Sequence, residues 1–338
     1  MRPARVLHMV GSATSSFYHD LSMVYARSAL QPETMQHTFA VVEPGGRWRV
    51  GPSLNNLGAS VRISEFLNTL ERPDLVVPYM FDRAGMTSFR SFFEDVLGIP
   101  VVGSEAGAAA MAADKAITKT VVGAAGVRVP RTFASAPDSS DYPVIVKPAR
   151  EDNSLGLTLV EHPDQLRSAI LDAEQFDAGV IVEQYIPGRE IRVAVIELGG
   201  ELMVPAMLEY GVTHSHPMRT TDDKLELGDN GNPRAQAASL EAPMTCPAIV
   251  DSVLAASLKD QATRAHRSLG CRDYSLFDFR IDTETSEPYL LEACLFWTFG
   301  PISIISRMIE SGGDDPAAVA TQVWRNRMRN SMTSAKLT

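Results

Sequence analysis

Strand-like and helix-like runs alternate through the first hundred residues of this 338-residue chain, and this alternation limits the fold more than any other feature. Short apolar runs bounded by turns are typical of buried strands, and apolar residues recurring every three to four positions are typical of one helix face. Strands and helices in turn predict a parallel sheet covered by helices, with ligands bound beyond the carboxyl ends of the strands. Residues 11–16 and 80–87 follow two such strands, so we expect them at that edge, although ordinary connecting loops look the same. The strand-like runs are residues 5–10, 38–42, 74–78 and 99–102, and the helix-like runs are residues 17–30 and 88–97.

The chain is too long for one typical domain and suits two or three. We predict an α/β protein with an N-terminal parallel-sheet domain at residues 1–103, a central domain at 104–187 and a C-terminal domain at 188–338. An alanine-rich helical stretch at residues 106–125 opens the central domain. Residues 209–247 are rich in Gly, Pro, Asp and Asn and lack periodicity, which is typical of a functional lid or of disorder.

The charge and the cysteines of the chain limit which partners and which cellular location we expect. The formal net charge of −10 argues against nucleic acid or an anionic membrane as the main partner. No apolar run approaches the roughly 18 residues that a membrane helix needs. Three cysteines lie far apart and match no zinc spacing, so we expect reduced thiols and a cytoplasmic location. They are Cys246, Cys271 and Cys294.

Two segments suggest nucleotide binding. Lys147 ends the hydrophobic run 143–148, and the polar loop 150–156 that follows can place backbone N–H groups on phosphate oxygens. Residues 181–190 run through a Pro-Gly turn, where an extended backbone can bind an adenine edge and an acid past the turn can bind ribose hydroxyls. Each segment alone is equally typical of a strand-end lysine with a solvated charge, or of an ordinary hairpin.

Two carboxylates face each other across a predicted hairpin. The strand-like runs 277–281 and 289–293 flank a polar turn, and a symmetric hairpin puts Asp278 opposite Glu292. Cross-strand neighbours have Cβ atoms about 5 Å apart, so the two charges would repel each other without a cation. A magnesium ion shared with ATP phosphates would resolve this conflict. A solvated acidic pair is the alternative, but the neighbouring Phe, Ile and Leu residues disfavour it.

In these motifs and their order, the chain resembles D-alanine–D-alanine ligases and their ATP-grasp relatives over nearly its whole length. The resemblance implies an ATP-grasp fold and an ATP-dependent ligase that joins a small carboxylate to an amine through an acyl phosphate. It rests on the order and spacing of blocks that are weak one by one. The blocks are Gly103-Ser104 through Asp114–Lys119, Val144–Pro148 with Ser154–Gly156, Val182-Glu183 through Gly188–Glu190, and Asp278 with Leu290–Ala293.

The resemblance also implies a role for each matching residue. Asp278 and Glu292 would bind Mg²⁺, Ser303 would bind the carboxylate of the second amino acid, and Lys224 would be the lysine of the lid that contacts the phosphates. Relatives are commonly homodimers that act on small molecules. The residues implied to bind ATP are Lys115, Lys147, Ser154, Glu183, Gln184, Ile186 and Glu190.

Four positions depart from the family pattern. Cys294 stands where the family usually has Asn, which leaves open whether one or two Mg²⁺ ions bind. Leu276 stands where it usually has Arg, and Arg280, on the same strand face as Asp278, is a candidate replacement. Asn153 stands where a serine is usual, and the loop at residues 11–16 lacks the glutamate that grips the ammonium of the first amino acid.

A finer resemblance accounts for the missing glutamate. Residues 6–22 and 78–88 are similar to ligases of mycosporine-like amino acid biosynthesis. Those enzymes condense the carboxylate of mycosporine-glycine, which has no free ammonium, with an amino acid such as serine or threonine, in an amide- or imine-type C–N bond. The alternatives are a D-alanine–D-alanine or other dipeptide ligase, and a catalytically silent ATP-binding protein. The second amino acid stays open.

Overall fold

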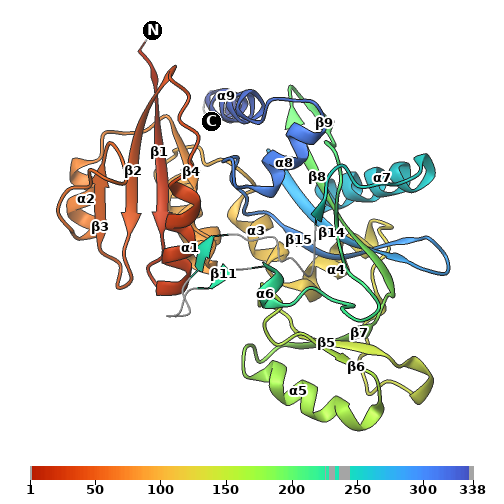
Figure 1. Ribbon diagram of the computed structural model, residues 1–338. Helices are drawn as coiled ribbons and strands as arrows, with labels where there is room; N and C mark the ends of the chain where they lie inside the picture. Colours follow the sequence, from red (N-terminus) through yellow and green to blue (C-terminus); the bar gives the residue numbers. More distant parts are fainter. Residues whose placement is uncertain (1, 225, 228–232, 236–243, 335–338) are drawn as a thin grey trace.

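The computed structural model describes residues 2–224, 226–227, 233–235 and 244–334, which form four sheets. Figure 1 shows the N-terminal sheet on one side, the largest sheet on the other, and a small sheet below the latter. The long helix α9 (Pro316–Ser334) lies across the top, between the two larger sheets. Among the described helices, none combines the length and the hydropathy that crossing a bilayer requires.

The N-terminal sheet has the strand order β3-β2-β1-β4. Its three strands β2, β1 and β4 are parallel, as predicted, and β3 adds an antiparallel edge that the pattern did not reveal. The strand-like run at 99–102 pairs with β4 in parallel, but only through a single bridge between Val76 and Val101. The predicted helix at 88–97 consists of two π-helical segments. The bounds are β1 Ala4–Gly11, α1 Ser16–Ala26, β2 Met35–Val42, β3 Trp48–Gly51, α2 Ile63–Thr69, β4 Leu75–Pro78, and π-helical Gly85–Phe89 and Phe92–Val96.

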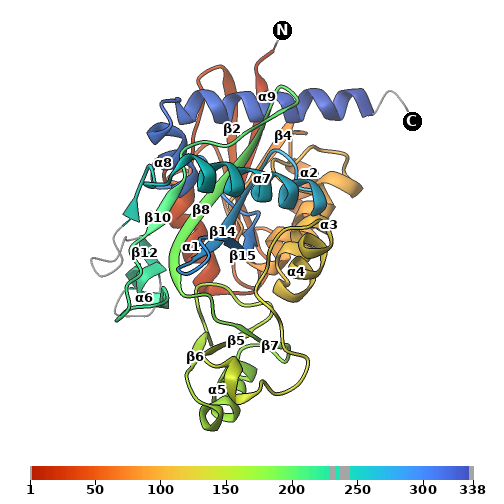
Figure 2. The same ribbon diagram turned by 90° about the vertical axis from the view of Figure 1, so that its right-hand side faces the viewer.

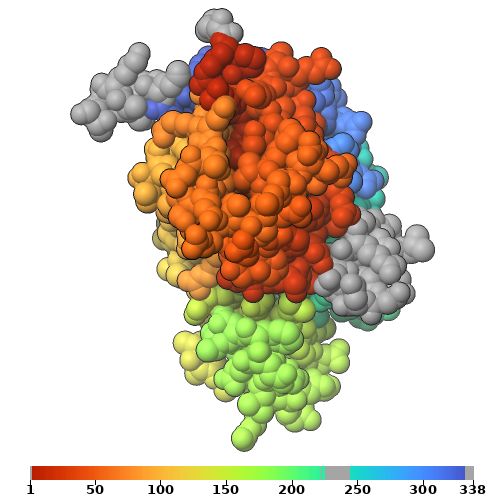
Figure 3. Space-filling view, turned by 90° about the vertical axis from the view of Figure 1, so that its left-hand side faces the viewer, coloured from red at the N-terminus to blue at the C-terminus, as the bar shows by residue number. Residues whose placement is uncertain are grey.

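The small sheet is antiparallel, in the order β6-β5-β7, and one helix covers it. Figure 3 shows this unit projecting below the N-terminal part of the molecule. Its core is small, with Val144 and Val146 of the central strand packed against Ala169 and Ala173 of the helix. The bounds are β5 Val144–Pro148, β6 Thr158–Val160, α5 Leu166–Glu174 and β7 Val180–Gln184.

The largest sheet is antiparallel, in the order β13-β10-β8-β14-β15, and β9 pairs with β8. Three helices pack on one of its faces, where Val193 and Phe277 lie in the core (Figure 2). Two of them, α3 and α4, come from the stretch that the sequence assigned to the central domain. The domain boundaries at 103 and 187 stay a prediction. The bounds are α3 Ala106–Ala112, α4 Lys115–Ala124, β8 Gly188–Leu198, β9 Glu201–Met203, β10 Leu208–Tyr210, β13 Met244–Thr245, α7 Ser252–Ser268, β14 Tyr274–Asp282, β15 Pro288–Cys294 and α8 Ile304–Ser311.

Part of the predicted lid, residues 209–247, lies outside the described residues. Its described part holds β10, α6 (Thr221–Lys224) and a strand pair, β11 (Glu226–Leu227) and β12 (Pro233–Ala235).

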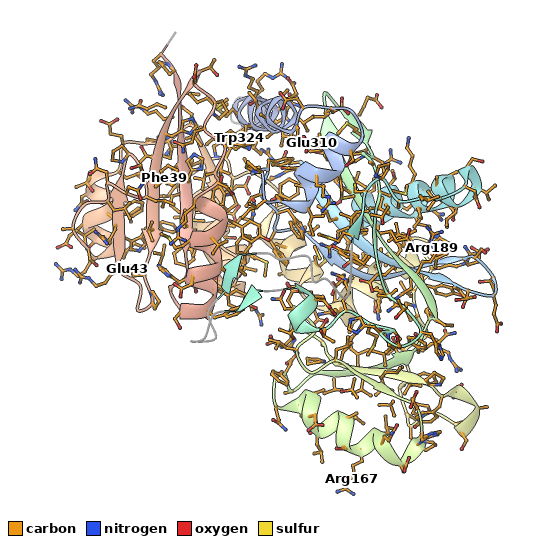
Figure 4. The ribbon with its side chains drawn as sticks, viewed as in Figure 1. Phe39, Glu43, Arg167, Arg189, Glu310 and Trp324 are labelled. Atoms are coloured by element: carbon orange, nitrogen blue, oxygen red, sulfur yellow. The ribbon has the colours of Figure 1, made fainter. Side chains whose placement is uncertain are left out.

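One continuous core joins the two larger sheets. It includes Val6 and Phe39 of the N-terminal sheet, Leu276 of the largest sheet, Ile305 of α8 and Trp324 of α9. Figure 4 shows Trp324 on α9 beside the sheet that carries Phe39. The N-terminal sheet is therefore fixed to the rest of the molecule by apolar packing.

Candidate active site

The predicted facing of Asp278 and Glu292 is confirmed. The two residues are cross-strand partners of β14 and β15, and Leu276 faces Cys294 in the same register. Because side chains alternate along a strand, Asp278 points to one face of the sheet while Phe277 and Phe279 pack on the helices behind it. Glu190 and Arg192 of β8 lie next to Arg280 and Asp278 of β14, so four charged side chains share one sheet face.

Two arginines neutralise Asp278, which corrects the sequence argument that the acid pair needs a metal for this. Arg192 donates from Nε and Nη2 to the two carboxylate oxygens of Asp278, both at 2.5 Å. Arg219 donates to Asp278 at 3.1 Å and to Glu190 at 2.5 Å. All four side chains are buried, and paired burial avoids the large free-energy cost of an isolated buried charge.

Lysines gather at the opposite side of the same site. Lys147, at the end of β5, donates to Glu183 of β7 at 2.6 Å, and Lys119 of α4 pairs with the other oxygen of Glu183. Lys115 donates to the backbone carbonyl of Glu151, in the polar loop after β5. The Glu183 carboxylate is therefore held by two lysines, so an adenine contact at this residue would use its backbone.

The first cavity, of about 740 Å³, lies between the small sheet and the largest one. Eleven of the twelve predicted site residues line it, whereas Ser303 does not. Their roles stay predictions. The eleven are Lys115, Lys147, Ser154, Glu183, Gln184, Ile186, Glu190, Lys224, Asp278, Arg280 and Glu292.

Glu292 is the carboxylate best placed for a cation. Burial alone would raise its pKa, but Lys224, Lys115 and Lys147 outweigh burial and hold the pKa of Glu292 below its usual range. Ligand atoms of Asp278, Glu292 and Cys294 lie within 4.8 Å of one another. A carboxylate offers about four acceptor positions, of which the arginines use three at Asp278, so one remains for a divalent ion shared with Glu292. The site thus fits Mg²⁺ through oxygen ligands.

Cys294 does not replace the missing asparagine as a ligand for a hard cation. Burial, and then the nearby Glu292, raise the pKa of the Cys294 thiol, which keeps it neutral. A neutral thiol is a weak acceptor and offers no oxygen to Mg²⁺.

The predicted catalytic residues have different surroundings. Arg280 donates to the backbone carbonyls of Gly188, at 2.8 Å, and Pro217, and its Nε lies 3.4 Å from Glu190. Arg280 lines the first cavity and is not among the residues that line the second. Ser303 is buried at the start of α8, and its hydroxyl has no partner among the described residues.

The second cavity, of about 780 Å³, adjoins the first, and Asp152, Arg219, Lys224 and Glu292 line both. Its other walls include six aromatic residues and come from all parts of the chain. Besides the shared residues, they are Tyr18, Leu21, Tyr25, Phe81, Asn153, Arg192, Tyr210, Asp223, Met244, Cys294, Phe296, Trp297 and Ile304.

Sequence reasoning missed Arg192 and Arg219. Arg192 carried a usable signal: it lies between Ile191 and Val193 in an apolar run, two positions after Glu190, so a strand puts both charges on one face. Arg219 carried none, because it lies in the irregular segment, where no periodicity fixes direction.

The chain is similar in sequence to a known family and to several of its members. The family model "D-ala D-ala ligase C-terminus" matches residues 124–323. The "uncharacterized protein y4sG" of Sinorhizobium fredii is 35% identical over 205 residues, covering 59% of this chain and 57% of that protein. The D-alanine–D-alanine ligase of Geobacter sulfurreducens is 32% identical over 209 residues, covering 59% of each chain. The chain thus spans less than two thirds of the length of these relatives.

The structure of the D-alanine–D-alanine ligase from Coxiella burnetii superimposes with a TM-score of 0.77 at 17% identity, covering 100% of this chain and 97% of that one. This likeness confirms the predicted ATP-grasp fold. Since the family model matches more than half of its residues, the chain belongs to the D-alanine–D-alanine ligase family.

Proposed function

We propose that the protein is an ATP-dependent ligase that joins a small-molecule carboxylate to an amine, using ATP and Mg²⁺. The observation that carries this proposal is the junction of the two cavities. Glu292 and Lys224 line both, so a phosphate in the first cavity and a carboxylate in the second would meet beside the same anion and cation.

The proposed reaction has two steps. A carboxylate oxygen attacks the γ-phosphorus, the bond from that phosphorus to ADP breaks, and an acyl phosphate forms. The amine nitrogen then attacks the acyl carbon, phosphate leaves, and the nitrogen loses a proton. Mg²⁺ held by Glu292 and Asp278 would neutralise phosphate charge during the first step.

The chain's own side chains have three tasks in this proposal. Lys115, Lys147 and Lys224 hold the phosphates and stabilise the charge that develops on them. The backbone at Glu183–Ile186 binds the adenine. Glu190 binds the ribose hydroxyls, for which its carboxylate must release Arg219 and Arg280. The enclosing walls exclude water, which would hydrolyse the acyl phosphate. Ser303, next to Ile304 of the second cavity, remains the candidate for the second substrate's carboxylate.

Two substrate classes compete within this reaction. The relatives named D-alanine–D-alanine ligase favour two amino acids, and Asp152 in the second cavity offers a carboxylate for a free ammonium. The aromatic walls favour instead a carboxylate that carries a ring, as in mycosporine-glycine. For this second candidate the aromatic side chains Tyr18, Phe81 and Trp297 are the specific support.

The test is ADP release by the purified protein with Mg²⁺ATP and a panel of paired substrates, with products read by mass spectrometry. The panel holds pairs of common amino acids, and mycosporine-glycine with serine or threonine. Turnover on plain pairs alone would support the dipeptide ligase, and turnover that needs the ring-bearing substrate would support the second candidate. ATP binding without turnover on any pair would contradict the proposal and favour a silent nucleotide-binding protein, in which Arg192 and Arg219 permanently occupy Asp278.

A further inference from the structure

Arg192 is held in one orientation by contacts on two sides. Its Nε and Nη2 form the paired hydrogen bonds to Asp278. The planes of Tyr210 and Trp297 flank the guanidinium, with the central carbon 5.4 Å and 5.1 Å from the two ring centres. A fork fixed by a carboxylate and stacked on aromatic rings loses little further entropy when it binds a ligand.

Arg192 lines the second cavity and keeps N–H groups that Asp278 does not use. A guanidinium has five N–H donors, and the pair with Asp278 uses two of them. Nη1 donates no hydrogen bond to any of the described residues. The side chain is 5% exposed, so these donors have little access to bulk water.

A second polar group beside Arg192 also lacks a partner. Tyr210 is 4% exposed and lines the same cavity, and its hydroxyl is buried without a hydrogen bond to any described residue. Leaving a buried hydroxyl unpaired costs free energy, which a polar ligand would recover. Arg192 and Tyr210 thus both line this cavity, and both carry donors without an acceptor among the described residues.

The cavity has room for an apolar ring next to these donors. Tyr18, Phe81, Phe296 and Trp297 form its walls, and offset or edge contacts between aromatic rings favour a flat partner. The ligand that matches both features is an anion with two in-plane acceptors on a ring-bearing body. A carboxylate meets the geometry of a guanidinium edge.

We infer that Arg192 binds the reacting carboxylate of a ring-bearing substrate in the second cavity, with Tyr210 donating to the same group. Glu292 and Lys224 lie at the junction with the first cavity, so a carboxylate on Nη1 is held close to the transferring phosphate. Arg192, on β8, thus supplies a cation beside Asp278 on the sheet face that also carries Leu276. This inference rests on the proposed function for the fate of the carboxylate, but not for its binding.

The probe that tests the inference is N-phenylglycine, which carries a ring and a carboxylate, with N-phenylglycinamide as its neutral match. Isothermal titration calorimetry of the full chain with each compound is expected to show binding of the carboxylate and much weaker binding of the amide. Arg192→Gln should weaken carboxylate binding roughly thirtyfold or more, because a buried charge pair loses one partner. Arg192→Lys should restore part of it, and amide binding should stay unchanged in both.

Two further measurements separate ligand binding from a merely structural role. The affinity for ADP measured without Mg²⁺ should change by no more than about twofold in Arg192→Gln, because Arg192 does not line the first cavity, whereas a substitution that disturbs the whole site would lower it as well. Tyr210→Phe removes the unpartnered hydroxyl, keeps the ring, and should weaken the carboxylate alone. If both Arg192 variants fail to fold, the affinity of Tyr210→Phe for N-phenylglycine tests the inference.

The inference is overturned if the wild-type protein does not bind N-phenylglycine, if carboxylate and amide bind alike, or if the folded variants keep wild-type affinity. Binding is measured without turnover, so its outcome is separate from that of the substrate panel. Arg192-dependent binding in a protein without turnover would leave this inference standing and remove the proposed function.

Discussion

The side chains around Asp278 show what alternation along a strand predicts and what it does not. The facing of Asp278 and Glu292 followed from hairpin symmetry, and the structure has that register. The neutralising cation did not follow, because Arg192 comes from β8, nearly ninety positions earlier, and sequence alone does not pair non-consecutive strands. Where distant segments form one side of a site, its charged groups can be paired only once the strand order is known.

Glu292→Gln tests the carboxylate at the junction. Glutamine keeps the size of the side chain but removes the negative charge on which Lys115, Lys147 and Lys224 act, and it leaves Mg²⁺ with a weaker ligand. ADP release, measured over a range of Mg²⁺ concentrations, should fall about a hundredfold or more, with more Mg²⁺ needed for half-maximal rate. Glu284→Gln, in the exposed turn of the same hairpin, should release ADP like wild type. Equal rates for the two variants would rule out the role of Glu292.

His8 makes stability depend on pH far from the site. Burial, and then His37, lower the pKa of the fully buried His8 from 6.5 to about 3. Between these values the unfolded chain binds a proton that the folded one does not, so the free energy of unfolding should fall as pH falls. One such group contributes about 1.4 kcal/mol per pH unit. Urea unfolding at pH values from about 6 to about 4.5 should show that the free energy of unfolding falls less steeply with pH in His8→Leu than in wild type. The same slope as wild type is expected for His162→Asn, at an exposed position, and an unchanged slope in His8→Leu would contradict the assignment.

Among the elements, those with a strong period were predicted best. β1, β2 and β4 contain the predicted apolar runs, because strands buried on both faces are almost entirely apolar: Val6 and Val10 of β1 face one core, and Leu7 and Met9 face the other. The alanine-rich stretch was predicted as one helix, but Asp114 caps a second helix there by accepting from the N–H groups of Ala116 and Ile117. The periodicity did not show where one helix ends and the next begins, and the cap at Asp114 sets that boundary.

Gly11, at the end of β1, tests how tightly one element meets the next. Its φ is +96°, and a Cβ would lie 2.1 Å from the carbonyl oxygen of Val42 on β2. Gly45 has nearly the same φ, +92°, with open space around it. In urea unfolding, Gly45→Ala should cost about 1 kcal/mol through backbone strain alone, and Gly11→Ala about 3 kcal/mol or more, because β1 and β2 must separate. Equal losses would mean that the contact relaxes.

In the whole molecule, one apolar core joins the N-terminal sheet to the largest sheet, although the sequence assigned them to different domains. The core that contains Trp324 spans both larger sheets, so we expect one cooperative unfolding transition for them. The predicted homodimer and the cytoplasmic location stay predictions.

Trp324→Ala tests this continuity. Trp324 is 1% exposed, and truncating so large a buried side chain costs about 3 to 5 kcal/mol. Circular dichroism during urea unfolding should show one transition at lower urea. Arg325→Ala, at an exposed position on the same helix, should leave the midpoint in place. A split transition in wild type, or an unchanged midpoint in Trp324→Ala, would show that the N-terminal sheet is stabilised independently.

The second cavity takes its walls from Tyr18 near the beginning of the chain, Asp152 in the middle and Trp297 near the end. Any compound that fills it touches all three regions at once and must leave when they separate. A compound that binds only the folded protein therefore raises the free energy of unfolding of the whole molecule, by an amount that grows with the logarithm of its concentration. The melting point can consequently serve as the detector in a search for the natural substrate, before any chemistry has been observed.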